Sequence, residues 1–322
     1  MSLIGFKCPK SGKNIRFEDC LKEGGCSDRC MSRSSLTLMS RVRKWTGTPS
    51  TTQLINGTML EFLKLTNDYY ENPLDMTFRV MGTKAHTGLE AQADELSLLE
   101  EYFHDGKMTG IADALEVEKF IHTLVDHKMT GHYKVLKALG VKKTEIDTGE
   151  IYKSGKRKGQ PKTVNVRRKT DEADMWEWEL QENRYRIFYE QSGFKVDRMK
   201  IEAFLRDFKY APKIEGYELK PIEYIDVARL PNEEVLEYFN IKIDSLKHAL
   251  ANGWSQPCEA RERWDDRRCE EFCPVAHLCP HGKEILAKKE ALEQHAENVV
   301  GVKDTLSDET KKLLNEKMKE EK

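Results

Sequence analysis

The sequence lacks three features that would each restrict its class: a long apolar run, a strong net charge, and cysteine through most of its length. A membrane-spanning helix needs about 20 consecutive apolar residues, and no stretch of this sequence approaches that. The formal net charge is −2 over 322 residues, so affinity for a polyanion would have to come from a local basic patch. The first residues also lack the basic-then-apolar order of a secretory signal. We therefore expect a cytoplasmic protein without a membrane partner.

The cysteines that are present fall into two groups, and none lies between residues 30 and 258. An intracellular chain of this size does not need disulfide bonds, so two four-thiolate metal sites are the favoured interpretation. The alternative is that some of these residues are ordinary buried or free thiols. The first group is Cys8, Cys20, Cys26 and Cys30, and the second is Cys258, Cys269, Cys273 and Cys279.

Composition divides the chain into four parts. Residues 1–33 form a loop-rich module around the first cysteines, 34–253 form the main domain, 254–281 hold the second cysteine group, and 282–322 form a charged helical tail. The length suits one large domain with additions, and it can bury a substantial core. Within the main domain, the segment 142–169 carries ten basic and three acidic residues.

Hydrophobic periodicity and turn residues predict both helices and strands. Residues 107–129 are β-compatible on both sides of a short charged connection, which predicts an antiparallel hairpin. A two-stranded excursion is expected in 145–169, and further strands in 195–208 and 218–230. Helices are expected at 34–45, 48–65, 82–103, 133–141, 176–193, 231–253 and 282–322, the second of them beginning at Pro49 with a Ser50 or Thr51 cap.

The hairpin carries residues suited to one kind of chemistry. Asp113 and Asp126 lie on opposite strands, so their side chains can meet at one end of the sheet. Lys128 follows Asp126 by two positions and projects from the same face, with the carbonyl of His127 between them. Metal-dependent phosphodiester hydrolysis needs carboxylates to hold a divalent cation and gains from a lysine that orients water. The alternative is that these are charges where a strand meets water.

Four elements, in this order, resemble the core of the PD-(D/E)xK nucleases, in particular their RecB-like branch. A histidine, His86 in GTKAHTGLE, precedes the hairpin. The hairpin supplies GIADAL around Asp113 and LVDHKM around Asp126. A later helix supplies Gln181 and Tyr185 in LQENRYRIFY, whose i, i+4 spacing places both on one helix face.

The resemblance extends over about residues 45–195 and implies an α/β fold. This is a restriction-endonuclease-like core, with a central mixed sheet flanked by helices, to which this chain adds an N-terminal four-cysteine module and a C-terminal cysteine cluster. The implied activity is that of a DNA nuclease, which we expect to be an exonuclease, dependent on Mg²⁺ or Mn²⁺. The implied roles are metal ligation by His86, Asp113, Asp126 and the His127 carbonyl, positioning of water by Lys128, and contact with the DNA phosphates by Gln181 and Tyr185.

The spacing of the second cysteine group is similar to that in RecB-like nucleases that hold a [4Fe-4S] cluster. This chain departs from the pattern because its first short gap is three residues and because Cys258 supplies a local fourth ligand. The implied ligands are Cys258, Cys269, Cys273 and Cys279. A Zn²⁺ site is the simplest assignment for Cys8, Cys20, Cys26 and Cys30. The alternative is that Cys30 or a neighbour completes the iron-sulfur cluster.

The basic segment 142–169 contains Lys156, Arg157 and Lys158 near the expected hairpin tip. DNA phosphates are the expected partners, because such contacts give affinity that depends on salt and not on base sequence. The alternative is a mobile solvated loop. Two other functions stay open: a catalytically silent nucleic-acid-binding protein on the same fold, and a zinc-dependent scaffold. No protein partner is indicated.

Overall fold

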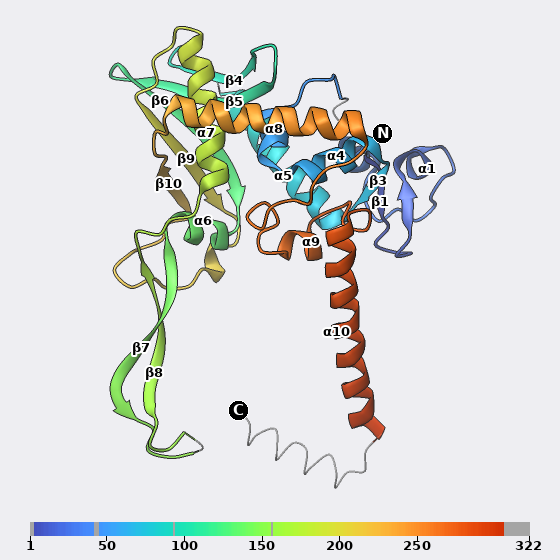
Figure 1. Ribbon diagram of the computed structural model, residues 1–322, viewed down its shortest axis with the longest axis vertical. Helices are drawn as coiled ribbons and strands as arrows, with labels where there is room; N and C mark the ends of the chain where they lie inside the picture. The colour runs from blue at the N-terminus through green and yellow to red at the C-terminus, as the bar shows by residue number, and fades with distance from the viewer. Residues whose placement is uncertain (1–2, 42–44, 93, 156, 306–322) are drawn as a thin grey trace.

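The computed structural model describes residues 3–41, 45–92, 94–155 and 157–305. At its centre is a five-stranded mixed sheet flanked by helices, which confirms the expected α/β class (Figure 1). The strand order is β10-β9-β6-β5-β4, in which β6 and β9 are parallel and the other neighbours antiparallel. The strands are β4 (Ser97–His104), β5 (Thr109–Glu118), β6 (Ile121–Thr130), β9 (Arg198–Leu205) and β10 (Ile222–Asp226).

The hairpin of β5 and β6 is confirmed, and it opens part of the way along. The two strands pair from Glu118 and Ile121 back to Ala114 and Val125. Beyond that point β5 continues beside β4, whereas β6 continues beside β9. The strands therefore separate at the level of Asp113 and Asp126.

The helices beside the sheet share one large apolar core with it. Among them, α7 packs against β5, β6 and β9, and also against α3 and α8. The expected helices 133–141, 176–193 and 231–253 are confirmed as α6, α7 and α8; Gly253 ends α8 in the left-handed region. The helices of this core are α3 (Thr51–Ile55), α4 (Thr58–Thr66), α6 (His132–Ala138), α7 (Trp176–Gln191) and α8 (Asn232–Asn252).

The single helix expected over 48–65 is two helices. Ser50 caps α3 through a capping box with Gln53, as the sequence predicts for the start. The chain then breaks at Asn56 and Gly57, between α3 and α4. A Cβ at Gly57 would lie 2.2 Å from the Sγ atom of Cys258, so the break allows the backbone to approach a residue of the second cysteine group.

The helix expected over 82–103 is confirmed as far as Glu90 and is wrong beyond it. A helix, α5 (Pro73–Glu90), begins at Pro73 and ends at Glu90, and residues 97–104 form strand β4. The run SLLEEYFH has apolar spacing compatible with either structure, and local pattern cannot choose between them. Pairing with β5 decides for the strand, because it brings Phe103 against Phe188 and Tyr189 of the core.

The N-terminal segment forms a second, smaller core with distant parts of the chain. A three-stranded sheet joins β1 (Leu3–Lys7), β2 (Asn14–Arg16) and β3 (Tyr69–Glu71), with α1 (Phe17–Leu21) and α2 (Arg33–Met39) beside it. Phe6 and Leu36 pack in one buried cluster with Met76 and Val275. The division of the chain into separate parts stays a prediction.

Two elements extend from the body in the same direction (Figure 1). One is the arm, an antiparallel pair of β7 (Val141–Ile151) and β8 (Pro161–Lys169), which confirms the expected excursion. The other is α10 (Pro280–Thr305), which follows α9 (Arg267–Glu271). A 3-10 helix, η1 (Phe208–Tyr210), lies between β9 and β10. Within the described residues, none of the helices has the length and apolar character to cross a membrane.

Candidate metal-binding site

Three carboxylates lie in a row across neighbouring strands where the hairpin opens. Glu100 lies between the pairs Leu99–Ala114 and Glu101–Ala112 of β4 and β5, which places it level with Asp113. Asp113 and Asp126 each lie one position beyond Ala114–Val125, where the pairing of β5 with β6 ends. Side chains at directly opposed positions share one face of a sheet. Because β5 and β6 no longer pair here, the carboxylate of Asp113 occupies the opening, where its Oδ2 accepts a hydrogen bond from the backbone N–H of His127 at 2.8 Å.

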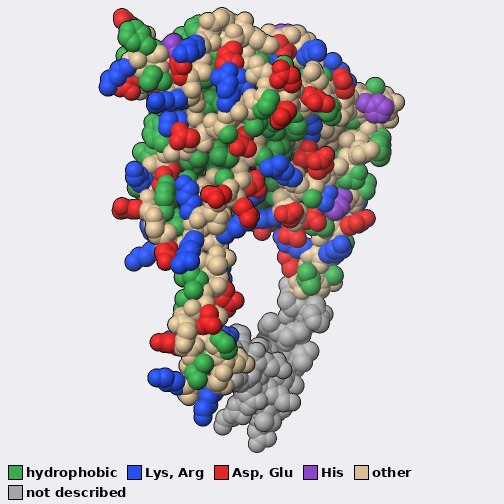
Figure 2. Space-filling model, turned by 60° about the vertical axis from the view of Figure 1, so that its left-hand side comes forward, with side chains coloured by type: hydrophobic (Ala, Val, Ile, Leu, Met, Phe, Trp, Pro, Cys, Tyr) green, Lys and Arg blue, Asp and Glu red, His purple; other side chains and the backbone are tan. Residues whose placement is uncertain are grey.

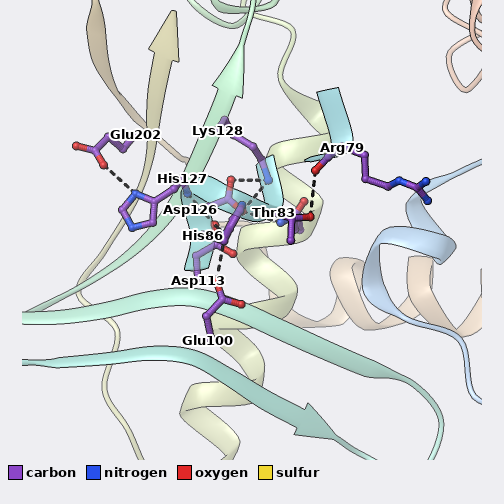
Figure 3. Close-up of polar contacts among 10 residues, drawn as sticks. Arg79, Thr83, His86, Glu100, Asp113, Asp126, His127, Lys128 and Glu202 are labelled. Atoms are coloured by element: carbon purple, nitrogen blue, oxygen red, sulfur yellow. Dashed lines mark hydrogen bonds and ion pairs between the residues drawn. The ribbon is translucent and has the colours of Figure 1, made fainter. Parts of the chain in front are cut away.

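His86 of α5 reaches this row from outside the sheet (Figure 3). Its Nδ1 lies 3.0 Å from Oε1 of Glu100 and 3.6 Å from Oδ2 of Asp113. One ligand atom from each of these three residues lies within 4.8 Å of the other two. One imidazole nitrogen and two carboxylate oxygens form a donor set that suits Mg²⁺ or Mn²⁺, so the residues fit a divalent cation.

The sequence does not indicate Glu100 as a ligand, because the expected helix over 82–103 includes it. Its backbone has φ of 53°, in the left-handed region that a residue with a Cβ seldom adopts. The register on either side of Glu100 is unbroken, so the distortion is local. Such backbone strain is concentrated at functional sites. The only sequence signal was the pair of glutamates, Glu100 and Glu101, within an otherwise apolar strand.

The electrostatics of the row favour a bound cation. Asp113 and Asp126 are both buried, at 9% and 1% exposure. Burial and the neighbouring Asp126 carboxylate raise the pKa of Asp113 to about 6. A divalent cation would relieve the repulsion between these carboxylates and replace the proton that Asp113 otherwise binds.

Lys128 and Gln181 both hold Asp126. The Nζ atom of Lys128 lies 2.7 Å from each carboxylate oxygen of Asp126. The Nε2 atom of Gln181, on α7, donates to Oδ1 of the same residue at 2.7 Å. Burial lowers the pKa of Lys128, but the carboxylates of Asp126 and Asp113 together outweigh that effect. The net shift of the pKa is upward, so the ammonium stays charged.

The ring of His127 turns away from the carboxylates. Its Nδ1 lies 2.8 Å from Oε2 of Glu202 on β9, as Figure 3 shows. Only main-chain atoms of His127 face the opening, and its N–H is already bonded to Asp113. The ring of His127 is therefore not placed to bind a metal ion in the opening. The prediction that its carbonyl oxygen is a ligand stays a prediction.

Tyr185 lies behind the site and packs against the hairpin. Its side chain is buried, and burial with the nearby Asp126 raises the pKa of its hydroxyl well above the ordinary value. A Cβ at Gly110 would lie 2.8 Å from the Tyr185 ring. A larger residue at Gly110 would therefore clash with Tyr185. This contact joins the GIADAL segment to the later helix that carries Gln181 and Tyr185.

Glu182 adds a fourth carboxyl group behind the row. It is fully buried, and its oxygens have no hydrogen-bond partner among the described residues. Burial and the Asp126 carboxylate raise its pKa well above the ordinary value, which favours the protonated form. Its neighbours on α7 are also buried, including Arg184, which pairs with Asp105, and Arg186, which bonds to Asn232.

The second cysteine group is gathered in the structure. Burial, together with the neighbouring cysteines, raises the pKa of Cys258, Cys269 and Cys273 to about 11. Cys279 is buried in the main core. In the part of the chain that the structure describes, no four cysteine sulfurs come as close together as one ion would need; Cys269 instead has Asp266 and His281 within 4.8 Å.

The first cysteine group is more exposed. A hydrogen bond from Ser11 lowers the pKa of Cys8, and Cys30 also bonds to that thiol. Burial raises the pKa of Cys20, and the charges of Cys26, Cys8 and Cys30 act in the same direction. Thiolates on short loops suit a metal ion in their chemistry, but among the described residues these four sulfurs are not gathered as the ligands of one ion.

Cations gather at the end of the arm (Figure 2). Arg157 lies over the ring of Tyr152, and Lys158 is exposed beside it; Lys156 lies outside the described residues. At the base of the arm, by contrast, Lys142 pairs with Glu172 and Arg168 with Glu215. Arg157 and Lys158 at the tip, unlike Lys142 and Arg168, thus have no acidic partner in the part of the chain that the structure describes.

Comparisons with known proteins give a distant structural likeness. No protein-family model matches the chain, and no curated protein matches it. Among solved structures, a crystal structure described as that of SSO0001 aligns with 77% of this chain and 92% of its own, at 14% identity and a TM-score of 0.38. At this identity and score the likeness assigns no activity to the chain.

Proposed function

We propose that this protein is a divalent-metal-dependent DNA nuclease. The observation that supports this most strongly is the row of Glu100, Asp113 and Asp126, with His86 at one end and Lys128 at the other. Buried carboxylates beside a charged lysine suit phosphodiester hydrolysis, in which negative charge develops at the phosphate and a water must be oriented. A site built only for structural stability would not keep repelling carboxylates buried.

The roles of the residues follow from their positions. His86, Glu100 and Asp113 would hold Mg²⁺ or Mn²⁺, with Asp126 and the His127 carbonyl as further ligands. When bound, such an ion polarises the phosphate and makes a bound water more acidic. Lys128 keeps its ammonium beside Asp126, where it donates to the attacking water or to a phosphate oxygen.

Two helix residues support this arrangement. Gln181 fixes the carboxylate plane of Asp126 through its hydrogen bond, so the carboxylate keeps one orientation toward the opening. Tyr185 packs under Gly110, and its hydroxyl lies among the acidic groups. Gln181 and Tyr185 both contact the hairpin in this structure. A DNA phosphate would therefore have to enter the opening between β5 and β6 to contact either side chain.

DNA is the substrate class that the arm supports. Arg157 and Lys158 present positive charge without an acidic partner among the described residues, and a phosphate backbone is the natural counterpart. The arm extends from the body just beyond β6 and α6, so it contacts a strand at a distance from the site. We expect exonuclease activity, as in the nucleases that the sequence resembles.

The two cysteine groups are assigned to structural metal centres. Cys258, Cys269, Cys273 and Cys279 would ligate a [4Fe-4S] cluster, whose cube holds its thiolates farther apart than one ion does. Cys8, Cys20, Cys26 and Cys30 would ligate Zn²⁺. Both groups adjoin the smaller core, so each centre would tie the chain ends to the nuclease domain.

The test is cleavage of end-labelled linear and circular DNA, single- and double-stranded, with Mg²⁺, Mn²⁺ or a chelator. Wild type is compared with Asp126→Asn and with Glu118→Gln, which changes an exposed carboxylate on the same hairpin. We expect metal-dependent cutting by wild type and by Glu118→Gln and none by Asp126→Asn. Cutting of linear DNA alone establishes an exonuclease. Binding without cutting by metal-loaded wild type would instead support a silent binding protein.

A further inference from the structure

The turn between β5 and β6, Lys119–Phe120, combines two unusual features. Both residues have positive φ, 50° at Lys119 and 64° at Phe120. A two-residue turn with this backbone strongly favours asparagine and glycine, and a bulky aromatic residue is an outlier there. The ring of Phe120 is also 93% exposed, the highest fraction among the exposed large hydrophobic residues of the described chain.

Neither feature serves the fold. An exposed ring contributes no burial, and a left-handed backbone at a residue with a Cβ is disfavoured, so asparagine or glycine would stabilise this turn. Strain of this kind persists where the surroundings hold it for a purpose. The turn joins two well-paired strands, with Glu118 opposite Ile121, so the ring is presented on a firm support.

The hairpin also fixes how far the ring lies from the carboxylate row. Six positions separate Phe120 from Asp126, and a strand rises about 3.3 Å per residue, which gives about 20 Å. Successive nucleotides of a stacked strand are about 3.4 Å apart, so the same span corresponds to about six nucleotides. A nucleic-acid strand that is cut beside the carboxylates and runs along the hairpin would therefore place a base next to Phe120.

The isolation of the ring identifies its partner. One phenylalanine, even with the exposed Leu96 near Val117, is too little apolar surface to anchor a membrane or to form the centre of a protein interface. A single ring does suffice for one nucleobase, since stacking on one aromatic side chain changes affinity about 5- to 150-fold. Lys119, the residue before Phe120, has no ion-pair partner among the described residues, so its ammonium could contact the phosphate next to the stacked base.

We propose that Phe120 stacks on an unpaired base of a nucleic-acid strand about six nucleotides from the bond to be cut. The proposal rests on the proposed nuclease function for the position of the cut, but the stacking contact itself does not require cleavage. It assigns the hairpin two contacts with one strand: chemistry at its open end and base stacking at its turn.

The test uses the full-length protein in the Lys128→Ala background, so that the DNA stays intact. Single-stranded oligonucleotides carry the fluorescent base 2-aminopurine at one position at a time, and wild-type cleavage maps the scissile bond. We expect quenching at one position about six nucleotides from that bond, lost in Phe120→Asn and kept in Phe120→Trp. The Kd of Phe120→Asn should rise about tenfold for strands that reach the turn.

Thermal unfolding distinguishes the loss of base stacking in Phe120→Asn from a folding defect. Phe120→Asn should be at least as stable as its parent, because asparagine tolerates the left-handed region. The control Tyr210→Asn, which removes an exposed aromatic ring from η1, should leave the quenching unchanged. Cleavage without position-specific quenching, or quenching that survives Phe120→Asn, overturns the proposal. Quenching without any cleavage by wild type would keep the stacking contact and reject the nuclease.

Discussion

Glu100 lies level with Asp113, between the β4–β5 pairs Leu99–Ala114 and Glu101–Ala112, and its Oε1 is 3.0 Å from Nδ1 of His86. Glu100→Gln keeps the shape of the side chain but removes one negative charge from the candidate metal site. We expect Mn²⁺ affinity to fall at least about tenfold, as for other changes beside a bound metal. Calorimetric titration of Mn²⁺ measures this directly.

The matched control for Glu100 is Glu101→Gln, which changes the next residue on the same strand, where the backbone is regular and the side chain is exposed. It should bind Mn²⁺ as wild type does. An equal loss of Mn²⁺ affinity in both variants would mean that the affinity depends on the total negative charge near the site and that Glu100 is not a ligand.

Asp113 should make the metal-free protein lose stability as pH rises. Burial and Asp126 raise its pKa from 3.8 to about 6, so the folded state favours the protonated form. This contribution is complete below about pH 4 and is lost as pH rises through about 6, at a cost of about 3 kcal/mol by pH 7. With a chelator present, Asp113→Asn should therefore be the more stable protein at pH 7.5 in urea unfolding.

The same titration gives a second readout, because Mn²⁺ competes with the proton on Asp113. Mn²⁺ affinity of wild type should rise with pH between about 5 and 7, in the range set by the raised pKa. If Asp113→Asn is no more stable than wild type at pH 7.5, or if Mn²⁺ affinity is flat with pH, the electrostatic account of the row is wrong.

Lys128→Met should separate metal binding from turnover. The ammonium lies 2.7 Å from both oxygens of Asp126 and competes with a cation for them, so its removal should tighten Mn²⁺ binding. Turnover should nevertheless fall about a hundredfold or more, because the group that orients water is gone. Single-turnover cleavage and Mn²⁺ titration give the two values. Lys247→Met, an exposed change on α8, should alter neither; weaker metal binding in Lys128→Met would contradict this role.

The cysteine groups should load different metals. In protein purified without oxygen, Cys273→Ser should lose iron and the visible absorption of a cluster while keeping zinc, and Cys26→Ser should do the reverse. Elemental analysis and absorption spectra measure both, and each loss should lower the unfolding temperature by about 5 °C or more. Loss of iron in Cys30→Ser would show instead that the first group completes the cluster.

The arm tip should contribute to salt-dependent DNA binding. Replacing both Arg157 and Lys158 by alanine should reduce the slope of log K against log salt by about 1.5, since each phosphate contact contributes about 0.7 to 0.9. Anisotropy titrations over a salt series provide the slope. The control pair, Lys142 and Arg168 to alanine, removes cations already paired with Glu172 and Glu215 and should change it less. Equal slopes for wild type and the tip variant would exclude the tip from the interface.

Much of the fold could be predicted because the signals were local. The β5–β6 hairpin, the arm and the helices α6, α7 and α8 follow from periodicity, turn residues and glycine stops such as Gly253. The failures came where local pattern was ambiguous. SLLEEYFH fits a helix or a strand, and the choice depended on the free edge of β5 that it covers. That one error hid Glu100.

By itself the sequence determined which chemistry was available: two aspartates and a lysine on one hairpin, a preceding histidine, and two sets of four cysteines. Only the tertiary structure decided how they meet. Strand separation at Asp113, the close approach of Gly110 to Tyr185, and the burial of the polar helix α7 on all sides arise from contacts between residues far apart in the chain. Such contacts have no local pattern, because each depends on the shape of a partner that the sequence places elsewhere.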